Sequence, residues 1–95
     1  MNMTATALAL PATLIQAQAQ SVADGLVASL LARLAQGGDA VLDASALTQF
    51  DSSALAVVLA CRRAVLAQGG TLRVTGLPER AQALAKVYGV SELLV

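Results

Sequence analysis

Histidine and tryptophan are absent from this sequence, and cysteine, tyrosine and phenylalanine occur once each. Without histidine, the chain lacks the commonest general base and the commonest zinc ligand. The single cysteine, Cys61, can form neither an internal disulfide nor a thiolate metal site. Ser52 and Ser53 have no histidine, and no neighbouring lysine or cysteine, to activate them as nucleophiles. We therefore expect no enzyme activity, no metal and no cofactor.

Charge and long apolar runs are also scarce. The six basic and six acidic residues sum to zero, and the basic ones are scattered, so the counterion-displacing stripe of a nucleic-acid-binding protein is missing. No apolar run approaches the roughly 18 residues of a membrane span, and no phosphate-binding glycine loop is present. These absences argue against nucleic acid as a partner, nucleotide binding and direct membrane insertion.

Strand-like and helix-like patterns alternate along the 95 residues. The expected order is a strand at 4–10, a helix at 18–36, a strand at 40–43, a helix from Asp51 to the stop at Gly69 and Gly70, a strand at 71–75, and a helix from Pro78 to Gly89. This alternation predicts one α/β domain over residues 1–95, with a mostly parallel or mixed sheet of about four strands and helices packed on it.

Apolar spacing predicts which side of each helix faces the core. In the first helix the core positions are Val22, Leu26, Leu30 and Leu34, with Val27 and Leu31 beside them. In the last helix they are Ala81, Leu84, Ala85 and Tyr88, and Leu93 and Leu94 are expected to fold back as a lid.

The middle helix is apolar all round, which is typical of a helix that is either fully buried or covered by a partner. Its large apolar residues, with Arg62 in line, are Leu55, Val58, Leu59 and Leu66, and we expect this side to face the core. The opposite side carries the small residues Val57, Ala60, Cys61 and Ala64. We favour the interpretation that a partner covers this side. An alanine-rich composition that simply fills the helix surface explains the pattern as well.

The helix start offers two interpretations. Asp51, Ser52 and Ser53 are all competent N-caps. They also lie where unpaired backbone amides and the helix dipole favour a partner's carboxylate or a phosphate on Ser52. A magnesium site of Asp43 and Asp51 would need a third acid and a lysine on a later strand, and the strand at 71–75 offers no lysine.

The stretch VLDASALTQFDSSALAVVLACRRAVLAQGGTLRVTGL resembles the central region of STAS domains, the module of anti-sigma factor antagonists. The resemblance makes Asp43 the aspartate that ends a strand and Ser52 the hydroxyl residue at the start of the regulatory helix. Ala54 departs from the glycine usual in the antagonists, which counts slightly against a kinase-regulated antagonist. The tail LPERAQALAKVYGVSELL is similar to the MlaB-like branch, the STAS subunits of Mla phospholipid-transport ABC complexes.

The resemblance implies a non-catalytic cytoplasmic subunit, held at the inner membrane by an MlaF-like ATPase subunit that is itself bound to the permease. The partner-binding residues expected on this basis are Asp51, Ser52, Ser53, Val57, Ala60, Cys61, Lys86 and Tyr88. The alternative is an anti-sigma factor antagonist that is switched by phosphorylation of Ser52.

Overall fold

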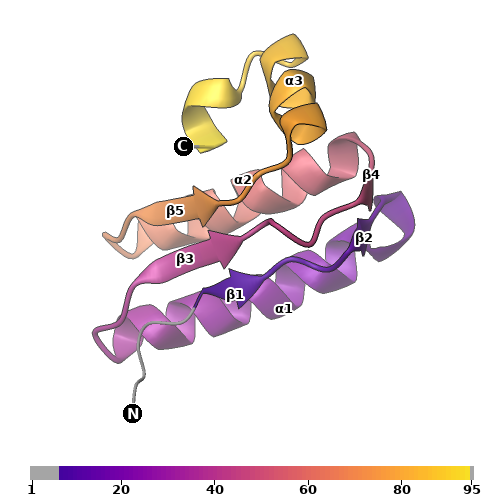
Figure 1. The fold of residues 1–95 in the computed structure, drawn as a ribbon. Helices are drawn as coiled ribbons and strands as arrows, with labels where there is room; N and C mark the ends of the chain where they lie inside the picture. The colour runs from indigo at the N-terminus through magenta and orange to yellow at the C-terminus, as the bar shows by residue number, and fades with distance from the viewer. Residues whose placement is uncertain (1–6, 95) are drawn as a thin grey trace.

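The computed structural model describes residues 7–94, and the expected order of strands and helices is confirmed there (Figure 1). The elements are β1 (Leu8–Ala9), β2 (Thr13–Leu14), α1 (Gln16–Ala35), β3 (Ala40–Asp43), β4 (Gln49–Phe50), α2 (Ser52–Ala67), β5 (Leu72–Thr75), α3 (Glu79–Val87) and the 3-10 helix η1 (Ser91–Leu94). Residues 4–6 of the expected first strand lie outside the described residues.

The main sheet has three parallel strands in the order β1-β3-β5. Leu42 of β3 is paired with Leu8 on one side and with Val74 on the other. Figure 1 shows α1 and α2 side by side on the same face of this sheet, with α3 and η1 beyond β5. The expected parallel sheet with crossover helices is therefore confirmed.

The number of strands differs from the expected four, because residues 7–94 contain five short strands in two sheets. A second, two-stranded parallel sheet pairs β2 with β4. Pro11 separates β1 from β2, and because proline has no N–H it cannot continue the ladder. The pairing resumes where the amides of Thr48 and Gln49 both donate to the carbonyl of Ala12, at 2.8 and 3.0 Å. The β2–β4 pair thus continues, past Pro11, the contact between the chain that leaves β1 and the chain that leaves β3.

The core lies between the main sheet and the α1–α2 layer and contains no buried polar side chain among the described residues. Its largest fully buried side chains are Leu10, Leu14, Leu30, Leu42, Val58, Val65 and Cys61. The predicted inner face of α1 is confirmed at Leu30, which is fully buried, and at Val22, Leu26 and Leu34, which are partly buried against the core.

The C-terminal segment is only partly as expected. Ala81 and Ala85 of α3 are buried, and Leu94 of η1 is packed into the core. Tyr88, however, is 58% exposed, so the prediction that it belongs to the inner face is wrong. Tyr88 lies at the C-cap of α3, where the chain is already turning toward Gly89. Its side chain has therefore left the buried side of the helix.

Candidate functional site: the turn at the start of α2

Asp51 lies between β4 and α2 and hydrogen-bonds with both oxygens of its carboxylate. Oδ1 accepts the amide of Ser53 at 2.8 Å, which makes Asp51 the N-cap of α2. Oδ2 accepts the amide of Gln16, the first residue of α1, at 3.3 Å. These hydrogen bonds lower the pKa of Asp51, and the bond from the Ser53 amide contributes most. One carboxylate thus holds together the starts of two helices.

Ser52 is the first residue of α2 and is exposed. Because Asp51 provides the cap, the interpretation of Ser52 as the capping residue does not apply. Ser53 is half-buried, and its amide is taken by Asp51. No acidic side chain lies in the first turn of α2, so the positive end of the helix dipole is offset only by the Asp51 cap.

Neighbouring segments hold the strand that leads into this turn. The guanidinium of Arg80, in the first turn of α3, lies 4.8 Å from the centroid of the Phe50 ring, a cation–π distance. Its Nη1 also lies 3.4 Å from the carbonyl of Thr48, which it approaches as a donor. From the other side, the hydroxyl of Thr48 donates to the carbonyl of Ala12 at 3.2 Å. The turn is therefore fixed by contacts from the β2 segment and from α3.

Sequence reasoning missed Arg80, Phe50 and Ile15 as residues of this region. Ile15 immediately precedes Gln16 and remains 36% exposed, which leaves an apolar side chain beside the Asp51 turn. No local pattern links position 80 to position 50, because their contact depends on how α3 packs. The only signal in the sequence was an arginine two residues after Pro78.

Asp43 is the last residue of β3, as the resemblance implied. Its Oδ1 accepts the amide of Ser45 at 2.9 Å, and hydrogen bonding by Ser45 lowers the pKa of Asp43. Gly76, after β5, approaches this loop so closely that a Cβ added there would lie 2.8 Å from the Cβ of Ser45. The φ of Gly76 is +69°, a conformation that favours glycine. Asp43 therefore shapes the loop that leads from β3 toward β4.

The buried side of α2 is only partly the one expected. Leu55 and Val58, predicted to face the core, are 4% and 1% exposed, which confirms that part of the prediction. Val57 is 2% exposed and Cys61 is fully buried, so both belong to the core, and the prediction that they contact a partner is corrected here. Leu66, predicted to face the core, is 44% exposed. The buried side is centred on Ala54, Val58, Cys61 and Val65, roughly a quarter turn from the predicted stripe of leucines.

The physical reason is that α2 packs against the sheet and against α1 at the same time. Small residues such as Ala54 and Cys61 allow this close double contact, and the larger Leu59 is only partly buried at its margin. The solvent side of α2 carries Ser52, Ala56 and Arg63, which are exposed, and Ala60, which is half-buried.

The remaining predicted contacts lie on α3. Lys86 and Tyr88 are both exposed. They follow Arg80 by six and eight residues, which places Lys86 about 9 Å farther along the helix axis than the arginine that contacts the turn. The start of α3, where Arg80 lies, therefore contacts the segment before the Asp51 turn, and the end of α3 lies farther from it.

Within residues 7–94, no group of His, Cys, Asp and Glu side chains is arranged to hold a metal ion. None of the described helices combines the length and the apolar character that crossing a membrane requires.

Two comparisons with known proteins bear on this geometry. A search of the curated proteins found no match. The family model described as Mlab, STAS domain, matches residues 12–95, a range that includes β2, the helices α1 to α3 and the whole Asp51 turn. The α/β architecture is consistent with this match, and the matched range contains both Asp43 at the end of β3 and the exposed Ser52 of α2. The chain therefore belongs to the MlaB-like family of STAS domains.

Proposed function

We propose that this protein is a non-catalytic subunit of an Mla-type phospholipid-transport ABC complex. It binds the ATPase subunit on the cytoplasmic side of the inner membrane, supports assembly and ATP hydrolysis of the complex, and so contributes to lipid asymmetry of the outer membrane. The lipid and the nucleotide are handled by other subunits. Membership of the MlaB-like family supports this proposal.

The observation that carries the proposal is the exposed Ser52 hydroxyl on a turn that other residues hold in place. The cap is supplied by Asp51, and Arg80 and Ala12 fix the preceding strand. A surface that is already ordered loses little conformational entropy on binding, which favours affinity.

The proposed contact surface continues along the solvent side of α2. Ser52, Ala56 and Ala60 follow one another at intervals of four residues, so they lie on one side of the helix. Their small side chains allow a partner to approach the helix backbone closely. Ile15 borders the Asp51 turn with an exposed apolar side chain, and Lys86 and Tyr88 extend the proposed surface along α3.

The substitution Ser52→Asp tests the contact. Aspartate is favourable near the positive end of a helix, so we expect the free energy of unfolding to change by less than about 1 kcal/mol. In a packed interface, the same carboxylate has to be desolvated, which can cost several kcal/mol of binding. We expect the variant to fold normally but to be lost when the ATPase subunit is purified from co-expressing cells.

The control is Ser29→Asp, which introduces the same charge at an exposed position of α1. It should co-purify with the ATPase subunit as the unmodified protein does. The ATPase rate should rise when the unmodified protein or the Ser29→Asp variant is present, and it should not rise with Ser52→Asp. Equal co-purification and equal rates for both variants would remove Ser52 from the interface.

An anti-sigma factor antagonist phosphorylated on Ser52 is the second candidate, because the exposed hydroxyl is also accessible to a kinase. The two candidates differ in genetic context: the transporter subunit is encoded beside an ABC ATPase and a permease, the antagonist beside a serine kinase and a sigma factor.

A further inference from the structure

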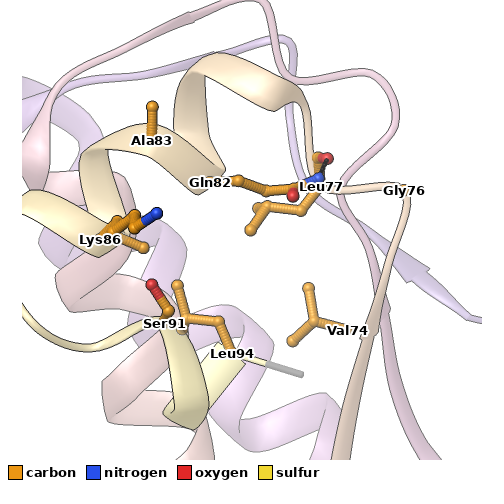
Figure 2. A pocket seen from close by; sticks show the side chains of 9 residues that line it. Val74, Gly76, Leu77, Gln82, Ala83, Lys86, Ser91 and Leu94 are labelled. Carbon is orange, nitrogen blue, oxygen red and sulfur yellow. Dashed lines mark hydrogen bonds between the residues drawn. The ribbon is translucent and has the colours of Figure 1, made fainter.

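A cavity of about 700 Å³ opens between the end of β5, α3 and η1 (Figure 2). This volume lies within the range of roughly 300–1,000 Å³ that is usual for small-molecule sites. The cavity does not include the Ser52 turn or the solvent side of α2. The cavity shares Lys86 with the proposed contact surface but none of its lining residues with the turn at Asp51 and Ser52.

The walls of the cavity are mainly apolar. Val74 comes from β5, Leu77 from the loop that follows, and Leu94 from η1. Figure 2 shows these side chains around the open space. The Gln82 side chain donates through Nε2 to the carbonyl of Leu77 at 2.8 Å, which ties the first half of α3 to the loop and keeps this end of the cavity in shape. Such walls suit the apolar body of a ligand.

One charged residue lines the cavity, and it is Lys86, the only lysine of the chain. Among residues 7–94, no carboxylate side chain lines the cavity beside this ammonium group. Ser91, from η1, adds a hydroxyl that can donate a hydrogen bond. A cation and a hydroxyl beside an apolar space recognise an anionic group attached to an apolar body.

We propose that this cavity binds a small amphiphile with one anionic head, of which a medium-chain carboxylate is the simplest example. The ammonium of Lys86 pairs with the head, Ser91 donates to it, and Val74, Leu77 and Leu94 contact the apolar body. The inference does not rest on the proposed transport function, because the isolated protein is sufficient for binding.

Decanoate is a suitable probe, and the single lysine makes the test specific. An amine-selective acylating reagent modifies Lys86, and mass spectrometry of the peptide that contains it measures the rate. We expect saturating decanoate to slow this modification about tenfold or more. In the Arg63→Lys variant, the introduced amine lies on the exposed side of α2, and its modification should keep its rate. Equal slowing at both positions, or none at Lys86, would overturn the proposal.

Calorimetric titration separates the role of charge from that of apolar contact. Lys86→Gln should weaken decanoate binding about tenfold, because a charge-assisted contact is lost. Decanol, which lacks the anion, should bind Lys86→Gln and the unmodified protein alike. Val74→Phe, at a half-buried side chain that points into the open space in Figure 2, should weaken both ligands by filling the space. Unchanged affinity of decanoate for Lys86→Gln would refute the ion pair, and unchanged affinity for Val74→Phe would place binding elsewhere.

Discussion

At the scale of the residue, Asp51 shows how one side chain can organise a site without being its contact point. The carboxylate serves the amides of Ser53 and Gln16, which belong to different helices. An acidic residue that the sequence offers as a partner contact is thus already engaged within the domain, and the neighbouring Ser52 is left exposed. We therefore infer that Asp51 positions the contact surface and that Ser52 provides it.

This arrangement predicts a pH dependence of stability. The folded-state pKa of Asp51 is lowered from its ordinary value of 3.8, the amide of Ser53 being the largest cause. The stabilisation is therefore complete above the unfolded-state pKa and is lost as the pH falls through the lowered folded-state pKa. Replacing Asp51 by asparagine removes the charge and keeps the cap, because asparagine caps a helix about as well as aspartate. The NH2 group of asparagine cannot accept the amide of Gln16, so that second bond is lost together with the charge.

The variant Asp51→Asn should accordingly have a lower Tm than the unmodified protein at neutral pH, and the difference should vanish in strong acid. Thermal melts followed by circular dichroism between neutral pH and about pH 2 measure this. Asp39→Asn, which changes the net charge equally at an exposed position, is the control. A difference in Tm that stays constant with pH would show that the charge of Asp51 does not stabilise the turn.

At the scale of the element, α2 shows why residue size misleads a prediction of the buried side. Leucines suggest the core because they bury a large apolar area. In α2, Leu55 is indeed buried, but so are Ala54 and Cys61 on the adjacent side, because the helix contacts both the sheet and α1. Leu66, near the end of the helix, remains exposed.

The position of Cys61 can be checked by its reactivity. Burial raises the pKa of the Cys61 thiol to about 11, so the reactive thiolate is scarce at neutral pH. We expect a disulfide reagent such as DTNB to leave the folded protein unlabelled and to react at once after denaturation in guanidinium chloride.

A matched control moves the thiol to the solvent side of the same helix. The double variant Cys61→Ala with Ala56→Cys places it at an exposed position, where the folded protein should react within seconds. Removing the buried sulfur should also cost about 1 kcal/mol of unfolding free energy. Immediate labelling of the unmodified folded protein would mean that Cys61 is accessible after all.

At the scale of the whole molecule, the arrangement in layers buries one face of the main sheet more completely than the other. Ala40 and Leu42 of β3 are buried toward α1 and α2, whereas Val41 and Asp43 alternate with them and are only half-buried. Because strand side chains alternate between faces, a single residue step along β3 moves from the core to a partly solvated surface.

Substitutions in β3 should reflect this difference. We expect Leu42→Ala to lower the free energy of unfolding by about 2–5 kcal/mol, because it leaves a cavity in the core. Val41→Ala should cost less than about 1.5 kcal/mol, since the site can be filled by solvent. Urea denaturation of both variants measures the two values. Similar losses for both would mean that the second face of the sheet is as tightly packed as the first.

The order of the elements could be predicted because its signals are local. Glycines after α1 and α2 end those helices, and Gly37 and Gly69 adopt the positive φ that such ends require. The sequence also predicted β5, in which Leu72 and Val74 alternate with polar residues, and the end of β3 at Asp43. The family resemblance added the proposed location of the site, and the structure shows that Ser52 at the start of α2 is exposed.

Tertiary packing decided what local signals left open. Asp51, Ser52 and Ser53 are equally competent caps in sequence, and Asp51 also accepts the amide of Gln16, which lies 35 residues earlier in the chain. Likewise, the burial of Cys61 depends on α1, and the contact of Arg80 with Phe50 depends on where α3 lies. Sequence by itself thus determined the elements and their ends, because these depend on neighbours along the chain. Only the folded structure determined which side chains remain for a partner or a ligand, because distant segments cover the others.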